Sequence, residues 1–134
     1  MKPTVFTLEK AKAALPLVSR IVGDVKNTWT KILTKKEEFT KRTQEDSSLG
    51  EDVLKFREEI QALADKMNDY DQELSQLGIE LKDPATGLID FYCRHEDRLV
   101  YLCWRHGEED IDFWHELDAG FAGRQPLDCL HETE

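Results

Sequence analysis

The strongest constraint on the fold of this chain is a pair of apolar stripes whose members are spaced alternately three and four residues apart. In an α-helix this spacing places the residues in one seam that packs against another helix. The first stripe, which Lys36 interrupts, consists of Leu8, Ala11, Leu15, Val18, Val22, Val25, Trp29, Ile32 and Phe39, and the second consists of Val53, Phe56, Ile60, Leu63, Met67, Tyr70, Leu74 and Leu77. The two seams predict a long antiparallel helical hairpin over residues 7–77.

Local signals mark the ends of these helices. Thr7 is expected to cap the first helix, which begins at about Leu8. Turn-forming residues between Gln44 and Asp52 end this helix and permit the chain to reverse. Gly78 stands where the second helix needs a residue in the left-handed conformation. The second helix is therefore expected to end just before Gly78.

The two helices differ in length, and Pro16 lies inside the longer one. About 37 helical residues span roughly 55 Å, whereas 26 residues span roughly 39 Å. The N-terminal part, Leu8 to Val18, is therefore expected to overhang and to be covered by the C-terminal third of the chain. Because Pro16 has no N–H group for the Lys12 carbonyl, we expect a kink or a break between Lys12 and Pro16.

Charge is distributed unevenly along the chain, which has a formal net charge of −10. Residues 1–50 carry 10 basic and 6 acidic side chains, whereas residues 51–134 carry 8 basic and 22 acidic ones. The basic first helix thus meets an acidic second helix, in which residues 51–77 hold eight acids and three bases. This complementarity favours the antiparallel pairing and leaves no reason to expect nucleic-acid binding.

The C-terminal third contains two runs with β-strand composition, LIDFYCR and LVYLCWR, after a turn at Asp83–Gly87. With Glu96-Asp97 at the tip, residues whose numbers sum to 193 face one another in a β-hairpin, so that Asp90 lies opposite Cys103 and Tyr92 opposite Tyr101. One face should carry the core residues Ile89, Phe91, Cys93, Val100, Leu102 and Trp104. The other should carry Leu88, Asp90, Tyr92, Leu99, Tyr101, Cys103 and Arg105, a polar and aromatic surface that an ordinary solvent-facing strand does not require.

These elements predict a single domain over residues 1–134 of the α+β class, mostly α. It is a long antiparallel helical hairpin with a small C-terminal β-hairpin module that includes a Gly/Arg-rich loop, over residues 79–128. No run of 18 apolar residues and no apolar signal core is present, so we expect a cytoplasmic protein with no membrane span. The odd number of cysteines (Cys93, Cys103 and Cys129) favours reduced thiols over a disulfide framework.

Several side chains after residue 87 carry chemistry, and His115 is the first choice among them. The candidates for ligand binding are Asp90, Tyr101, Cys103, Arg105, Glu108, Trp114, His115 and Arg124. The sequence HELD at 115–118 lacks the second histidine of the HExxH zinc motif, which excludes that class of protease site. Imidazole, carboxylate and thiolate from His115, Asp90 and Cys103 suit zinc or a similar divalent ion. The alternative is a structural histidine bonded to a carbonyl or carboxylate. No cofactor is predicted outright.

Two further interpretations are weaker. A Cys103 nucleophile with His115 as base lacks any motif for an oxyanion hole or a thiolate-stabilising helix end. The loop Gly120–Arg124 can expose N–H groups beside a guanidinium for an anion. Its alternative interpretation, which we favour, is a tight turn in which Phe121 plugs the core and Arg124 pairs with Glu108 or Asp118. The aromatic residues Trp104, Phe113, Trp114 and Phe121 are then expected to form a small core beneath the loop.

The segments GLIDF, LCWR, GE, FWH and GFAGRQP follow one another in this order after a TLEKAKAALPLV opening. Together they resemble a bacterial family catalogued as domain of unknown function 2203, and the resemblance covers nearly the whole chain. It implies a small bacterial cytoplasmic protein and transfers no activity. The residues that match its motif without assigned roles are Asp90, Trp104, Glu108, Trp114, His115, Gly120, Gly123 and Arg124.

Two functional hypotheses follow from these patterns. The first is a self-associating interaction protein without catalysis, because a two-helix platform leaves apolar residues such as Ile21, Leu33 and Leu54 uncovered. It predicts a homo-oligomer, and the sequence does not identify any other protein partner. The alternative is a small-ligand or metal-dependent enzyme with a site around His115.

Overall fold

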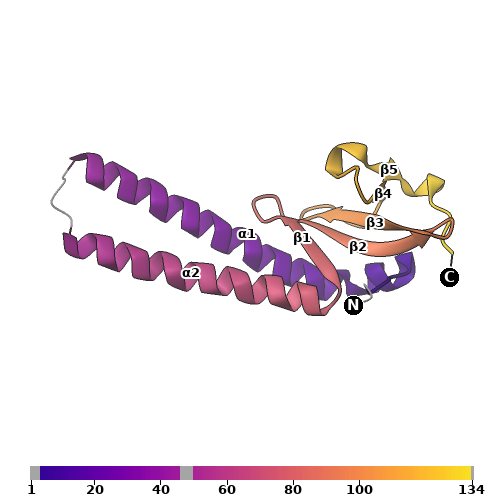
Figure 1. The fold of residues 1–134 in the computed structure, drawn as a ribbon, viewed down its shortest axis with the longest axis horizontal. Coiled ribbons are helices and arrows are strands. Elements are labelled where there is room, and N and C mark those ends of the chain that lie inside the picture. The colour runs from indigo at the N-terminus through magenta and orange to yellow at the C-terminus, as the bar shows by residue number, and fades with distance from the viewer. Residues whose placement is uncertain (1–3, 46–49, 134) are drawn as a thin grey trace.

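The computed structural model describes residues 4–45 and 50–133, and the expected chain reversal at residues 46–49 lies outside them. The elements are α1 (Leu8–Glu45), α2 (Gly50–Gln76), β1 (Ile79–Asp83), β2 (Leu88–His95), β3 (Arg98–Arg105), β4 (Phe113–Glu116) and β5 (Gln125–Pro126), with short 3-10 helices at Phe121–Gly123 and Leu127–Cys129. The two helices run side by side and project well beyond the sheet as an arm (Figure 1). The predicted α+β class, mostly α, is confirmed.

Helix α1 begins where its sequence signals place it, because Thr7 Oγ1 accepts a hydrogen bond from the Lys10 N–H at 3.1 Å. The helix is continuous through Pro16, so the chain does not break there. Across the described ranges, neither helix combines the length and the apolar character needed to cross a bilayer.

Side-chain pairs along the arm confirm that the basic helix lies against the acidic one. Lys35 meets Glu59 at 3.0 Å and Arg42 meets Asp52 at 2.6 Å, and between them the rings of Phe39 and Phe56 stack with centroids 4.2 Å apart. Each exposed ion pair contributes at most about 1 kcal/mol, so the charges select the pairing and the apolar seam stabilises it.

The seam on α2 is less buried than its spacing predicts. Of its eight apolar positions, Leu74 alone is fully buried, and Leu63 is half-buried. Val25 on α1 is fully buried, as expected. The difference arises because the sheet covers only one end of the hairpin, so that the arm is two helices thick and leaves one edge of each seam in contact with water.

The N-terminal overhang of α1 is covered by the sheet, as the length mismatch predicts. The shared core consists of Ala11, Val18, Ile21 and Val22 from α1, Leu74 from α2, and Ile79, Ile89, Phe91, Cys93, Val100, Leu102, Trp104, Ile111 and Trp114 from the C-terminal third. Ile21 is therefore covered within the chain, contrary to the prediction that it needs an outside partner. Leu33 and Leu54 remain exposed at 49% and 62%.

Five antiparallel strands form the sheet in the order β1-β2-β3-β4-β5. The β2–β3 register is the predicted one, with Asp90 opposite Cys103 and Tyr92 opposite Tyr101. Glu96 and Asp97 form the tip with φ of 49° and 65°, which matches the right-handed twist of a two-residue hairpin turn. The sequence predicted this hairpin alone, so β1, β4 and β5 enlarge the expected module into a sheet.

The aromatic residues after residue 100 do not form the small core expected beneath the loop. Trp104 and Trp114 lie in the main core, on the face of the sheet that packs against α1. Phe113 is half-buried on the opposite face, and Phe121 is 42% exposed and does not plug the core. The alternation along β4 separates Phe113 from Trp114, because neighbouring residues of a strand point to opposite faces.

Leu74 and Leu63 provide a matched test of the hairpin. Leu74→Ala should lower the free energy of unfolding by about 2 to 5 kcal/mol, because the side chain is fully buried in the core. Leu63→Ala should lower it by roughly half as much, because water already reaches that seam. Urea unfolding of the two variants measures both values. Equal losses would contradict the view that the arm is less buried than the sheet end.

Candidate metal centre

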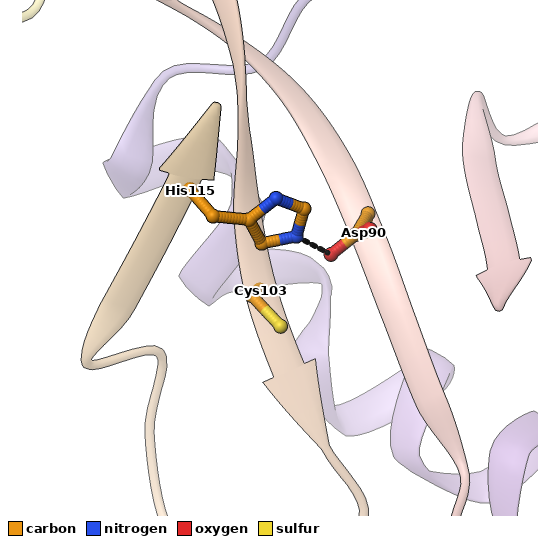
Figure 2. A group of neighbouring side chains, drawn as sticks. All are labelled: Asp90, Cys103 and His115. Carbon is orange, nitrogen blue, oxygen red and sulfur yellow. Dashed lines mark hydrogen bonds and ion pairs between the residues drawn. The ribbon is translucent and has the colours of Figure 1, made fainter. Parts of the chain in front are cut away.

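Three neighbouring strands bring Asp90, Cys103 and His115 together on the face of the sheet that points away from the helices. Asp90 on β2 pairs with Cys103 on β3, and His115 on β4 pairs with Tyr101, two residues before Cys103 on the same face. One ligand atom from each of the three residues lies within 4.8 Å of the others. Figure 2 shows the carboxylate, thiol and imidazole pointing toward one another. All three side chains are buried, with 2%, 0% and 1% of their surface exposed.

The hydrogen bonds of His115 fix which ring nitrogen faces the cluster. Nδ1 lies 2.7 Å from the Glu116 carbonyl oxygen, which can only accept, so Nδ1 carries a proton. Nε2 lies 3.0 Å from Asp90 Oδ1. In the neutral ring, Nε2 would present its lone pair to a carboxylate oxygen. A cation between them, either a proton or a metal ion, is therefore required at this position.

Burial and charge set the pKa values of the cluster without a metal. Burial opposes the charged imidazolium, but the hydrogen bonds to Asp90 and to the Glu116 carbonyl outweigh it, so the pKa of His115 is raised. Burial, reinforced by the negative charge of Asp90, raises the pKa of the Cys103 thiol to about 12, although Arg124 partly opposes the shift. The protein alone therefore holds a thiol beside an imidazolium–carboxylate pair.

The cluster offers the donor set that zinc takes in proteins, namely a nitrogen, a sulfur and a carboxylate oxygen. The Glu116 carbonyl holds His115 by its other nitrogen, which is the usual way in which a metal-binding histidine is oriented. Three protein ligands leave a fourth position of a tetrahedral ion open, as in catalytic rather than structural zinc sites.

A cavity of about 130 Å³ lies above the cluster. It is lined by Lys82, Leu88, Asp90, Tyr101, His115, Leu117, Gly120 and Phe121. Leu117, Gly120 and Phe121 form its roof, where the chain after β4 crosses back over the sheet. Gly120 has φ 65°, a left-handed value that favours glycine, so this residue lets the roof turn. An open position on a bound ion would face this cavity.

A hydrogen-bonded group from β1, β2 and β3 borders the cavity. The hydroxyls of Tyr92 and Tyr101 donate to the two carboxylate oxygens of Glu80 at 2.7 and 2.9 Å. Lys82 Nζ forms an ion pair with Glu80 at 2.5 Å and lies 3.5 Å from the Tyr101 hydroxyl. Burial opposes the charge of Glu80, but the hydrogen bonds from Lys82, Tyr92 and Tyr101 outweigh it and lower the pKa of this carboxyl.

Arg124 supports the cluster from the side and is not free to bind an anion. Its Nη2 donates to Glu108 at 2.6 Å and to the Cys103 carbonyl at 3.3 Å, and its guanidinium lies over the Phe113 ring at 4.2 Å. The expected Arg124–Glu108 pair is confirmed, and it satisfies the charge that an anion-binding loop would have needed. Arg105 lies beside this group with its guanidinium 5.1 Å from the Phe121 ring.

The geometry also argues against a cysteine nucleophile. Both nitrogens of His115 are engaged, with Glu116 and with Asp90, so that neither is committed to withdrawing a proton from Cys103. A thiol pKa of about 12 leaves almost no thiolate at neutral pH.

Trp114 is the one predicted site residue that lies on the wrong face of the sheet. It is buried in the core, and its Nε1 donates to the Pro126 carbonyl at 3.1 Å. The residues that line the cavity but were not among the candidates are Lys82, Leu88, Leu117, Gly120 and Phe121. The short alternation from Ile79 to Lys82 indicates a strand that carries Lys82. The sequence did not reveal that this strand pairs with β2, and so it did not place Lys82 at the cavity.

Comparison with known proteins adds a family but no chemistry. A profile of the family described as "Uncharacterized conserved protein (DUF2203)" matches residues 4–127 of the chain. No curated protein and no solved structure is similar enough to count as a match. The role of the cluster must therefore be argued from its geometry.

The raised pKa of His115 makes a prediction about the metal-free protein. A histidine whose pKa is higher in the folded than in the unfolded state stabilises the fold fully below its unfolded pKa of about 6.5. This contribution is lost as the pH rises through the folded pKa. Urea unfolding, carried out with a chelator present, measures the free energy of unfolding of wild type and of His115→Gln. Wild type should be the more stable of the two, and the difference should be largest at about pH 6 and should shrink toward pH 9. A difference that grows with pH would contradict the imidazolium–Asp90 pair.

Proposed function

The chain belongs to the family of uncharacterized conserved proteins DUF2203, and we propose that it binds a divalent metal ion, with zinc as the first choice, and uses that ion to act on a small ligand. The observation that carries this proposal is the buried convergence of Asp90, Cys103 and His115, with ligand atoms within 4.8 Å of one another. The matched family supplies no activity, so the proposal rests on the site alone.

A bound ion accounts for a cluster that is otherwise costly. An imidazolium and a carboxylate that are almost fully buried lose several kcal/mol each of hydration, and their mutual attraction offsets only part of this loss. A divalent ion held by these three residues would balance the charges of the Asp90 carboxylate and a Cys103 thiolate, and it would take the place of the proton at His115 Nε2. Coordination would also lower the pKa of the Cys103 thiol, because a metal-bound thiol is deprotonated.

The chemistry open to such a site is Lewis-acid chemistry at the cavity floor. An ion with three protein ligands can bind and polarise an oxygen of a small molecule, or lower the pKa of a bound water. Leu88, Leu117 and Phe121 supply the apolar part of the cavity wall, and the cavity stays open to solvent beside the exposed Leu117 and Phe121. A metal-dependent enzyme of small molecules is therefore our first functional proposal.

Metal analysis with single substitutions tests the centre. Wild type equilibrated with zinc and desalted should retain about one ion per chain, whereas Asp90→Asn, Cys103→Ser and His115→Gln should each lose most of it, because each removes one of the three ligands. Cys129→Ser is the matched control, since that cysteine is exposed and is not one of the three residues of the cluster. Zinc should also raise the melting temperature of wild type and not of the ligand variants, because it binds only the folded site.

Two results would count against the metal centre. One is wild-type protein that retains no metal. The other is a His115→Gln variant that melts several degrees lower yet keeps its zinc, which would make the histidine a structural residue.

A second candidate function, self-association through the helical arm, is favoured by the half-buried seam of α2. We propose that two copies pack their arms together, with the basic α1 of one copy beside the acidic α2 of the other. The same basic side chains already pair with acids in the chain, as Lys35 does with Glu59, so nucleic-acid binding is not part of this proposal. The buried thiols Cys93 and Cys103 and the exposed Cys129 suit a reducing compartment, and we propose the cytoplasm.

Native mass measurement tests the arm. The wild type should have twice the chain mass of 15.6 kDa. Leu33→Lys combined with Leu54→Glu should shift the mass to that of one chain, because these exposed leucines lie on the arm and charges there resist burial. Leu117→Glu, an equally exposed leucine over the sheet, should leave the mass unchanged. A wild type that is monomeric at every concentration tested would exclude self-association.

A further inference from the structure

We propose that the ligand of the metal centre is a small uncharged carbonyl compound, whose oxygen binds the ion and whose carbons lie against Leu88, Leu117 and Phe121. This inference rests on the proposed metal-binding function and names its ligand class. Three observations carry it, namely the residues that the cluster shares with the cavity, the pairing of the charges on the described cavity wall, and the apolar side chains that complete this wall.

The cluster and the cavity share two residues. Asp90 and His115 belong to the buried cluster and also line the cavity of about 130 Å³. An ion held where the three side chains of Figure 2 converge would therefore border the cavity, and the position that its protein ligands leave open would take one ligand atom. The cavity is smaller than the roughly 300 to 1,000 Å³ of pockets for drug-sized ligands, so the molecule has only a few carbons.

The charges on the described part of the cavity wall already have partners. Lys82 forms an ion pair with Glu80 at 2.5 Å, and its side chain is 38% exposed, so that water can satisfy its remaining donors. Asp90 pairs with His115 at 3.0 Å, and together with a Cys103 thiolate it would balance the two charges of a bound ion. A charged ligand would enter this site without a partner for its charge, and an unpaired charge in a partly buried site is costly. The charge balance therefore favours an uncharged molecule.

The polar groups of the wall are also engaged, which favours a carbonyl over a hydroxyl as the oxygen donor. The Tyr101 hydroxyl donates to Glu80 at 2.9 Å. With an ion at Nε2, His115 would keep its Nδ1 proton on the Glu116 carbonyl at 2.7 Å, so its ring would have no lone pair left to act as a base. A hydroxyl that binds as an alkoxide must pass its proton to a base, whereas a carbonyl oxygen loses no proton when a Lewis acid binds and polarises it.

The apolar part of the wall gives the carbons of the ligand a surface to cover. Leu88, Leu117 and Phe121 line the cavity, and Leu117 and Phe121 are 47% and 42% exposed. A ligand that lies against these side chains removes apolar surface from water, and the gain in affinity grows with the area that it covers. Among small carbonyl compounds, those with a longer carbon chain should therefore bind more tightly until the cavity is full.

Cobalt-loaded protein provides a spectroscopic test, because the visible absorption of Co²⁺ in a tetrahedral site changes when a ligand enters its open position. The probes are butyramide, its charged isostere butyrate and the shorter acetamide, all at neutral pH, where butyrate is ionised. Butyramide should change the cobalt spectrum in a saturable manner. Acetamide should bind about ten-fold more weakly, because it buries two CH₂ groups fewer. Butyrate should also bind about ten-fold more weakly or worse, because its charge has no partner in the site.

Leu117→Ser tests the apolar wall. It should weaken the binding of butyramide roughly three- to ten-fold and change that of acetamide much less, because serine removes apolar surface and leaves the ion in place. Leu17→Ser, at an equally exposed leucine of α1 that does not line the cavity, is the matched control and should bind both amides as wild type does. Far-ultraviolet circular dichroism and cobalt content verify that each variant is folded and loaded.

The outcomes separate the two proposals. A wild type that takes up no cobalt overturns the metal centre, and the ligand assignment with it. A loaded wild type whose spectrum does not respond to butyramide, or that binds butyrate as tightly as butyramide, overturns the ligand assignment and leaves the metal centre standing. Equal affinity for the two amides, or a Leu117→Ser variant that binds butyramide as tightly as wild type does, has the same consequence, because the apolar wall then does not contact the ligand.

Discussion

The rest of this structure depends on the packing of one face of the sheet against the N-terminal half of α1. Ile89, Phe91, Leu102 and Trp104 are buried there together with Val18 and Val22. Because the side chains of a strand alternate between its two faces, committing these residues to the helix forces Asp90, Tyr101 and Cys103 onto the opposite face. The candidate site is thus a direct consequence of where the core is.

That opposite face is unusual because it is polar and yet buried. A single sheet over one layer of helices ordinarily leaves its outer face to water, whereas here the chain after β4 folds back over it. Leu117 and Phe121 line the cavity, and Arg124 is bonded to Glu108 and to the Cys103 carbonyl on the same face of the sheet. The roof removes Asp90 and His115 from water. The attraction of a bound ion to these two side chains would offset much of the hydration free energy that they lose.

The two halves of the molecule meet at Gly78, where the chain leaves α2 and enters β1. Gly78 has φ 85°, and a Cβ added there would lie 2.4 Å from the Thr4 side chain, so any other residue would push the N-terminal segment away. This turn lets β1 pair with β2 directly beside the end of the arm, and β1 carries Lys82 to the cavity wall. The arm and the site are therefore joined through the short segment from Gly78 to Lys82.

Local patterns in the sequence determined the helical hairpin, the two faces of β2 and β3 and their register, because each of these depends on residue spacing and on a tip of two residues, Glu96 and Asp97. They also singled out Asp90, Cys103 and His115 as ligands without showing that the three meet. That meeting, like the place of Lys82 and the burial of Trp114 on the other face, was decided only in the tertiary structure. The strands β1, β4 and β5 are too short to give a recognisable β pattern in the sequence. Pairing between separate segments also depends on the free energy of the whole sheet rather than on any spacing along the chain.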